Sequence, residues 1–552
     1  MNNESLALKA VDRLYSRLDK NPELYDSYHS VFEEYKNLGI IEEIPLHDIV
    51  NQNPIYYMIH FPVIKEFSST KIRPVFNCSA SSYNGISLND CLESGPSLNP
   101  DLCEIILRYR RYPIAVSSDI TKAFLQISVV EEDRDVHRFL LKNDDDIKHY
   151  RFRRVPFGNT SSPFILNATI KHHLENYPSN PVVDELKVDT YVDNFLTGAN
   201  TVAEALSKYS EAHSIMSKAN MDLTKVVSNS QVITDIYGSN TFEFKNGELS
   251  ILGLNWNPVE DVFKFKPIEL HSDVNVTKRV VLSVLAKIFD PIGYLSPYVM
   301  YGKLLFQDIW KEGLNWDSEL PDEFKNRFMN WIESSKHFES FSLPRCYFPQ
   351  AYWPSENVEI VAFGDASTKG YGSVVYLRRK LENGDYDCQI VMSKSRVAPL
   401  KKITLPRLEL LASLLCARLV AYVMNALKLS KNTKITCFTD STITLAWIQS
   451  DANCRKLFVA NRVLEIQSLT PPSCWRHCSS ESNPADLISR GVLADQLVSN
   501  SLWLHGPENL SELIENDKIE KYNTQEESKP SVACLVVQND KYKNMKYVNY
   551  ND

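Results

Sequence analysis

The length of the chain limits its fold more than any other feature. With 552 residues, it is too long for one efficient hydrophobic core, so we expect three or four compact units. Hydrophobic residues make up 43% of the chain and charged residues 23%, which is typical of globular proteins. The most apolar stretch, residues 408–427, contains Glu409 and Arg418 and therefore favours a buried helix over a membrane span.

Helix-like and strand-like segments alternate along the chain. Residues 5–18 and 23–39 have the spacing of helices, whereas residues 55–76 consist of short strand-like runs. Two apolar arms around a polar centre predict a hairpin at residues 188–199. A β-rich segment and a long helix starting at Leu405 occupy the last third. This mixture predicts an α/β (α+β) multidomain protein.

Shifts in composition indicate where the units end. We expect them to cover residues 1–50, 51–255, 256–355, 356–495 and 496–552. The first unit is helical, and the last is a polar C-terminal tail that we expect to be poorly ordered past Pro507.

The charge of the chain leaves its partners open. A net charge of −9 is not what a nucleic-acid-binding domain usually carries. Basic residues nevertheless cluster at 108–111, 148–154, 264–279 and 378–380. One such cluster is more often a solvated surface than a phosphate-binding track, but several beside carboxylates are compatible with a nucleic-acid groove.

The eleven cysteines are scattered, and the chain opens without the apolar core of a signal peptide. This pattern favours reduced thiols in an intracellular compartment. We therefore expect an intracellular protein that does not contact a membrane.

Two aspartates in the first half of the chain follow or interrupt strand-like runs. Asp119 ends the run 114–118, and Asp193 lies at the centre of the predicted hairpin. Either residue alone would usually satisfy backbone donors in a turn. Together, on neighbouring strands, they could bind a pair of divalent ions, since nucleotidyl transfer uses two ions and Mg²⁺ prefers oxygen ligands.

The motifs around these aspartates resemble those of reverse transcriptases. Asp119–Phe124 (DITKAF) resembles motif A, Val155–Phe164 (VPFGNTSSPF) resembles motif B, and Tyr191–Asn194 (YVDN) resembles the metal-binding motif C. Residues 70–80 (TKIRPVFNCSA), 221–229 (MDLTKVVSN) and 251–256 (ILGLNW) resemble the fingers segment, motif D and the primer grip, in the order of the family.

This resemblance implies roles for single residues in nucleotide binding. Arg73 would contact the incoming triphosphate, and Phe124 would exclude a ribose 2′-hydroxyl, although an ordinary core aromatic fits the same pattern. The remaining nucleotide-site residues that it implies are Phe157, Gly158 and Tyr191.

Asn194 departs from the resemblance, because the second position of the motif C pair is normally an aspartate. An amide keeps the size but removes a charge, so metal affinity and charge neutralisation should both fall. We expect a polymerase of reduced or absent activity, and a weak but working polymerase stays open.

Four further carboxylates occur in a fixed order in the last third. Asp365 ends the strand-like EIVAFGD, Glu409 lies early in the helix-like LPRLELLA, Asp440 ends KITCFTD, and Asp486 lies in NPADLISRG. This order resembles the ribonuclease H fold of retroelements, in which four carboxylates bind two Mg²⁺ ions. The resemblance implies that His477 assists product release.

The exact residues of these motifs resemble those of the BEL/Pao class of LTR retrotransposons. FGDAS, LPRLELLA, FTDSTITLAWI and NPADLISRG carry the resemblance, together with RVVLSVLAKIFDPIGYLSP at residues 279–297. It extends from about residue 10 to 510. The chain is thereby identified as resembling the reverse transcriptase and ribonuclease H portion of a Pol polyprotein.

The resemblance also implies the architecture, cofactors and partners. Fingers and palm would cover 51–255, a Pao-type thumb or connection segment 256–355, and an RNase H-like mixed sheet 356–495. Each active site would use two Mg²⁺ (or Mn²⁺) ions. The partners would be an RNA template, a DNA primer, RNA–DNA hybrids and deoxynucleoside triphosphates, within a cytoplasmic virus-like particle or in the nucleus.

Two other functions remain open at this point. An aspartic peptidase needs a glycine shortly after its aspartate, and neither GDAS at Asp365 nor FTDST at Asp440 has one. A catalytically dead nucleic-acid-binding protein is the non-enzymatic alternative, motivated by Asn194. Such a protein would bind hybrids in a salt-dependent way without extending or cutting them.

Overall fold

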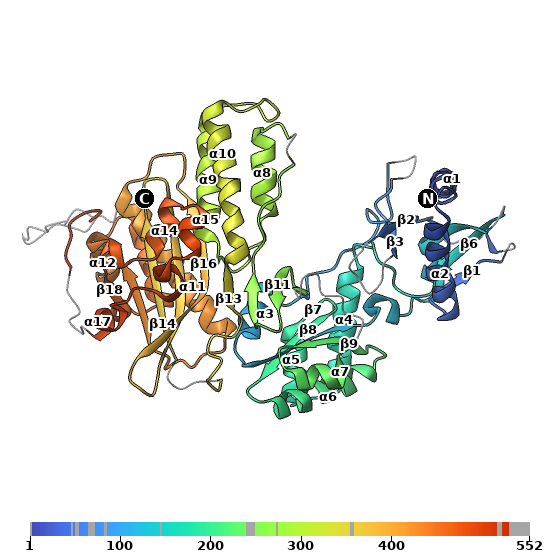
Figure 1. The fold of residues 1–552 in the computed structure, drawn as a ribbon, viewed down its shortest axis with the longest axis horizontal. Coiled ribbons are helices and arrows are strands. Elements are labelled where there is room, and N and C mark those ends of the chain that lie inside the picture. The colour runs from blue at the N-terminus through green and yellow to red at the C-terminus, as the bar shows by residue number, and fades with distance from the viewer. Residues whose placement is uncertain are drawn as a thin grey trace, which may run out of the picture.

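The structure is a computed structural model. It describes residues 3–45, 48–49, 54–64, 72–81, 85–143, 146–238, 249–271, 274–353, 358–515 and 522–528. Figure 1 shows an elongated molecule with the N-terminal elements at one end and the C-terminal sheet at the other. The described residues form a mixed α/β protein with several separate sheets, so the predicted fold class is confirmed.

The N-terminal end combines two helices with two small sheets. These elements are α1 (Glu4–Leu18), α2 (Pro22–Asn37), a sheet of β1 (Ile41–Glu43), β6 (Asp146–Phe152) and β5 (Arg138–Asn143), and the hairpin β2 (Ile59–Ile64) and β3 (Ile72–Asn77). Apolar residues of α1 recur at helical spacing and are buried, including Ala7, Val11 and Leu18. The predicted N-terminal helices and the strand-like runs at 55–76 are confirmed.

The next unit is a four-stranded sheet in the order β7 (Thr190–Tyr191), β8 (Asn194–Ala199), β4 (Ile114–Ile120), β9 (Leu223–Ser228). The helices α4 (Ser162–Leu174), α5 (Pro181–Asp189), α6 (Val202–Ser217) and α7 (Gln231–Tyr237) accompany it (Figure 1). Its core includes Phe195, Tyr209 and Leu223. β7 and β8 form the hairpin predicted at residues 188–199.

A second four-stranded sheet and an upright group of helices follow (Figure 1). The strands are β10 (Leu249–Ile251), β11 (Leu254–Asn257), β12 (Val262–Lys264) and β13 (Ser342–Pro344), and the helices are α8 (Lys278–Lys287), α9 (Ser296–Lys311) and α10 (Asp322–Ser334). The buried Trp331 stacks on Tyr298 at 5.0 Å between ring centroids and so joins α10 to α9.

The last sheet has five strands in the order β16 (Tyr386–Val397), β15 (Gly370–Lys380), β14 (Val358–Ala366), β17 (Ile435–Thr439), β18 (Trp475–His477). β14 runs antiparallel to β15 but parallel to β17, and β17 runs parallel to β18. The accompanying helices are α11 (Leu405–Ala426), α12 (Thr442–Gln449), α13 (Leu457–Leu469) and α14 (Ala485–Arg490).

Both faces of this sheet are covered. A Cβ on Gly364 would lie 3.1 Å from the carbonyl oxygen of Ala412 in α11, whereas one on Gly372 would lie 2.3 Å from Ile488 in α14. Gly372 pairs with Asp365, the next residue after Gly364. Because successive residues of a strand point to opposite faces, α11 and α14 cover opposite faces of the sheet.

Helix α11 is long and apolar enough, by length and composition alone, to cross a membrane. Two thirds of its most apolar window is buried against the rest of the protein, however. Its buried residues include Leu410, Cys416 and Val420. This burial accounts for the apolar composition and agrees with the buried helix expected at residues 408–427.

The C-terminal residues are more structured than their composition predicts. The helices α15 (Ala494–Val498), α16 (Ser501–His505) and α17 (Leu510–Glu515) follow α14. The side chains of Leu510 and Ile514 are buried, so the expectation of poor order past Pro507 is wrong for α17. Residues 522–528 also contact the last sheet domain, and residues 529–552 lie outside the described part of the chain.

Two buried arginines link the units, and we call Arg110 and Arg345 the arginine junction. Arg345 binds Asp261 through Nε and Nη2 at 2.6 and 2.7 Å and donates to the carbonyls of Tyr109, Tyr112 and Pro113. Arg110 donates to the carbonyls of Pro344, Arg345 and Ile390. The junction therefore joins the end of α3 (Leu102–Tyr109) and the segment before β4 to the second sheet and to β16.

Two candidate active sites

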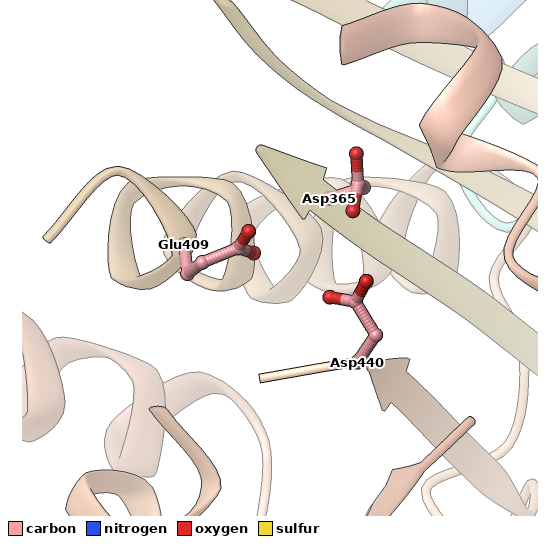
Figure 2. A group of neighbouring side chains, drawn as sticks. All are labelled: Asp365, Glu409 and Asp440. Carbon is pink, nitrogen blue, oxygen red and sulfur yellow. The ribbon is translucent and has the colours of Figure 1, made fainter. Parts of the chain in front are cut away.

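Three carboxylates converge at one edge of the five-stranded sheet. Phe363 of β14 pairs with Phe438 of β17, and Asp365 and Asp440 each follow two residues later, so both end at the same edge. Glu409 reaches them from the start of α11. One oxygen of each carboxylate lies within 4.8 Å of the others, and Figure 2 shows the three side chains directed toward one another. We call Asp365, Glu409 and Asp440 the carboxylate triad.

The surroundings of the carboxylate triad disfavour negative charge on its members. Asp365 and Glu409 are 3% and 6% exposed. Burial, together with the neighbouring carboxylates, raises the pKa of Asp365 to about 7 and that of Glu409 to about 9. The Oε2 atom of Glu409 is buried without a hydrogen-bond partner. A divalent cation among these oxygens would supply both the missing partner and the missing positive charge.

Asp486 and His477 lie beside the carboxylate triad. Asp486, in the first turn of α14, is outside the group of three, and its Oδ1 accepts a hydrogen bond from Arg490 Nε at 2.8 Å. Burial and the charge of Asp440 raise the pKa of Asp486, while Arg490 opposes this change. His477 ends β18, and its Nε2 lies 3.2 Å from the backbone oxygen of Asp440. All five residues predicted for this site are thus close together.

The second acidic pair lies on the four-stranded sheet. Asp119, near the end of β4, pairs with Asn194, the first residue of β8. Ile120 donates its N–H to the carbonyl of Asp193 at 2.7 Å, and Asn194 Nδ2 donates to Asp193 Oδ1 at 2.8 Å. Val192 has φ = +56° in the turn before Asp193. Since a β-branched residue rarely adopts this conformation, the turn that presents Asp193 is strained.

This pair already has basic neighbours from the chain itself. Lys225 Nζ of β9 lies 3.3 Å from Asp119 Oδ2. Burial raises the pKa of Asp119, and the charge of Asp193 adds to this, whereas the charges of Lys225 and Arg73 lower it. Arg73, whose charge acts on Asp119, belongs to β3 of the N-terminal hairpin. Among the described residues, the carboxylate triad is the only group of three potential metal-ligating side chains.

The other residues predicted for nucleotide binding lie in three segments, the residues after β4, the Val155–Phe164 loop and the β7–β8 hairpin. The rings of Phe124 and Phe157 meet edge to face at 5.0 Å, with Phe124 8% and Phe157 42% exposed. Gly158 has φ = +101°, and a Cβ there would lie 2.4 Å from the carbonyl oxygen of Phe76 in β3. Only glycine allows this approach of the Val155–Phe164 loop to β3. Tyr191 pairs with Asn194 in the hairpin.

Three side chains at these sites were not singled out from the sequence. They are Lys225 on Asp119, Arg490 on Asp486, and Ser480, whose Oγ donates to Asp440 Oδ2 at 2.6 Å. Arg490 follows Asp486 by four residues in a helix, a spacing that could have revealed the pair. Lys225 and Ser480 carry no comparable local signal, because their partners lie far away in the sequence.

Comparisons with known proteins agree with both halves of the chain. Residues 64–230 match the family model described as reverse transcriptase (RNA-dependent DNA polymerase). Residues 277–441 match the model described as Pao retrotransposon-like RNaseH-like domain. These matches confirm the resemblance to a Pao-class Pol segment with reverse transcriptase and RNase H-like domains. No curated protein is significantly similar to the chain.

Solved structures of foamy viral enzymes are similar to the chain. The foamy viral protease-reverse transcriptase dRH in complex with double-stranded DNA has a TM-score of 0.54 and 14% sequence identity, covering 83% of this chain and 69% of that one. The foamy viral protease-reverse transcriptase in complex with double-stranded DNA has a TM-score of 0.49 at 14% identity, covering 83% and 82%. At this identity, the first of these shows a common fold and no more.

Proposed function

We propose, from the premise of a Pao-class reverse transcriptase and RNase H-like segment, that this chain cuts RNA in RNA–DNA hybrids and extends DNA primers with reduced efficiency. The observation that carries the proposal is the carboxylate triad, whose three oxygens lie within 4.8 Å of one another. Three acidic groups are held together at high electrostatic cost, which is typical of a catalytic metal site.

The residues present fit a pair of divalent ions at the carboxylate triad. Asp365, Glu409 and Asp440 would hold Mg²⁺ or Mn²⁺. Asp486 would become a further ligand once its side chain rotates away from Arg490. Two such ions supply an activated water and neutralise charge on the phosphate and the departing 3′-oxygen. Ser480 donates a hydrogen bond to Asp440 and so orients it, and His477, which contacts the Asp440 backbone, would assist product release.

The pair Asp119 and Asp193 would serve nucleotidyl transfer in the same way. Arg73 would bind the triphosphate, while Phe124 supported by Phe157 would limit space at the sugar. Lys225 competes with a metal ion for Asp119, and Asn194 supplies no charge. These two features support a weaker metal site here than at the carboxylate triad.

The substrates of the proposal are a primed RNA or DNA template with deoxynucleoside triphosphates, and then RNA in the resulting hybrid. We further propose an intracellular location, in a cytoplasmic virus-like particle or in the nucleus, as the family resemblance implies.

The test measures primer extension on an RNA template with Mg²⁺, and hybrid cleavage in the same reactions. The variants are the parent, Asn194→Asp, Asp119→Asn and Asp365→Asn. We expect cleavage by all except Asp365→Asn, and extension that is weak in the parent and lost in Asp119→Asn. Hybrid binding without either reaction in the parent would contradict the proposal and favour the non-enzymatic alternative.

A further inference from the structure

Residues 522–528 lie across the RNase H-like domain, and we call them the C-terminal strap. The backbone N–H of Tyr522 donates to Gln449 Oε1 at 3.2 Å, and Trp447 Nε1 donates to the carbonyl of Glu526 at 3.1 Å. Ser528 forms an isolated antiparallel bridge with Arg455. The strap is therefore fixed to α12 and to the start of α13 at several points.

Three basic side chains from two segments, α11 and the residues just before α13, converge on the strap. Arg407 of α11 binds Glu527 Oε1 through Nε at 2.9 Å and Nη2 at 2.7 Å. Lys456 Nζ lies 3.7 Å from Glu527 Oε2, and its backbone N–H donates to the carbonyl of Glu527 at 2.7 Å. Arg455 Nη1 donates to the carbonyls of Thr524 and Glu526 at 2.8 and 3.1 Å.

The strap is a poor match for so much positive charge. Within the described part of the chain, Glu527 is the one carboxylate that pairs with Arg407 and Lys456. The Arg455 guanidinium donates only to neutral oxygens of the strap. The Oε2 atom of Glu527 is buried without a hydrogen-bond partner. A phosphodiester backbone offers anionic oxygens at regular intervals, which suits separated arginine and lysine side chains better.

One end of the strap lies close to the carboxylate triad. The ring of Tyr522 lies 6.3 Å from the ring of His477, whose Nε2 contacts the backbone oxygen of Asp440. Arg407 and Glu409 share α11 but are two residues apart, so their side chains leave different faces of the helix. A strand that takes the place of the strap would therefore approach the proposed cleavage site at the Tyr522 end.

We propose that Arg407, Arg455 and Lys456 form a binding site for the phosphate backbone of a nucleic acid, and that the C-terminal strap occupies this site as an intramolecular competitor. The inference rests on the proposed nuclease function, because it assigns the site to the same substrate. Glu527 stands where a backbone phosphate binds once the strap is displaced. The strap then lowers the affinity of the resting protein for RNA–DNA hybrids.

The test measures hybrid binding by the full chain without divalent ions, so that no strand is cut. The variant Glu527→Gln removes the charge that holds Arg407 and Lys456. We expect about two- to fivefold tighter binding, the range that corresponds to losing one partly exposed ion pair. The matched control is Glu512→Gln on the exposed face of α17, with unchanged affinity. Adding Arg407→Gln to Glu527→Gln should reverse the gain.

A second measurement follows hydrogen exchange with and without hybrid. Displacement predicts faster exchange at the amides of the strap and of Lys456 when hybrid is bound. Slower exchange in the strap, or equal affinity of the parent and Glu527→Gln, would overturn the inference. Tighter binding by Glu527→Gln without cleavage by any variant in Mg²⁺ would support the inference while removing the nuclease assignment.

Discussion

The two acidic sites of this chain balance their charge in different ways. At the carboxylate triad, three buried or half-buried acidic groups face one another, and one buried oxygen has no hydrogen-bond partner. At the second site, Asp119 has Lys225 at 3.3 Å and Asp193 accepts a hydrogen bond from Asn194. The first site depends on an added cation for its balance, whereas the second is largely balanced by the chain itself.

This difference shows how a single change can alter the demand of a site for metal ions. An aspartate at position 194 would place a second carboxylate beside Asp193, and metal ions would then be needed to offset the repulsion. The asparagine instead donates a hydrogen bond to Asp193. We infer that Mg²⁺ binds more tightly to the carboxylate triad than to the pair Asp119 and Asp193.

The largest expected effect comes from removing one charge at each site. Asp365→Asn should lower hybrid cleavage by about a hundredfold or more, because several kcal/mol of metal-dependent charge stabilisation are lost. Asp119→Asn should do the same to primer extension and leave cleavage unchanged. Single-turnover assays with labelled hybrid and labelled primer measure the two rates. Loss of both activities in either variant would mean that the two sites are not independent.

A smaller effect is expected from Asn194→Asp. Restoring the second carboxylate should raise primer extension by about tenfold, the equivalent of ~1.4 kcal/mol of transition-state stabilisation. Titration of extension against Mg²⁺ concentration should show a lower half-saturation point, with cleavage as the internal control. If extension is unchanged, Lys225 and not Asn194 would account for the weak polymerase activity.

The pH dependence of stability should separate the two sites without any assay of activity. The ordinary pKa values of 3.8 for Asp365 and 4.5 for Glu409 rise to about 7 and about 9 in the fold. The folded protein therefore binds these protons more tightly than the unfolded chain. The stability that they contribute is complete below about pH 4 and is lost as the pH rises through about 7 and 9.

In EDTA, we expect the Tm of the parent to fall by roughly 5 °C between pH 5 and pH 9 because of these groups. The variant Glu409→Gln should show a flatter profile, since it removes the carboxylate with the larger change in pKa. Mg²⁺ should restore the Tm of the parent at pH 9 but not that of Glu409→Gln. Thermal unfolding in both buffers measures this, and identical profiles would contradict the assignment of a metal site.

The smallest effect concerns the strained turn of the second site. Val192→Gly should change the free energy of unfolding by less than ~1 kcal/mol, because relief of the strain at φ = +56° is offset by lost packing of the Val192 side chain against the core. Primer extension should nevertheless fall, since a looser turn holds Asp193 less firmly. Denaturant unfolding gives the free energy, and cleavage serves as the unaffected reference. A rise in extension would show that strain at Val192 does not position Asp193.

The sequence predicted much of this arrangement from local patterns. The hairpin around Asp193 and the strand ends at Asp365 and Asp440 followed from apolar runs interrupted by polar residues, and family motifs supplied their chemistry. The C-terminal helices were missed because a few buried residues, such as Trp503 and Leu510, carry their packing. The partners Lys225 and Ser480 depend on contacts between segments that are distant in sequence, which no local pattern records.

The arginine junction has a consequence for how the two sites would work on one hybrid. Arg345 and Arg110 tie the segment before β4 to the second sheet and to β16 of the last sheet, with no exposure to water of either side chain. These contacts hold the proposed polymerase and nuclease centres at a fixed distance from each other. On a duplex that moves through the protein, the distance between the two centres would set where the RNA strand is cut. The length of the RNA fragments would then follow from the fold.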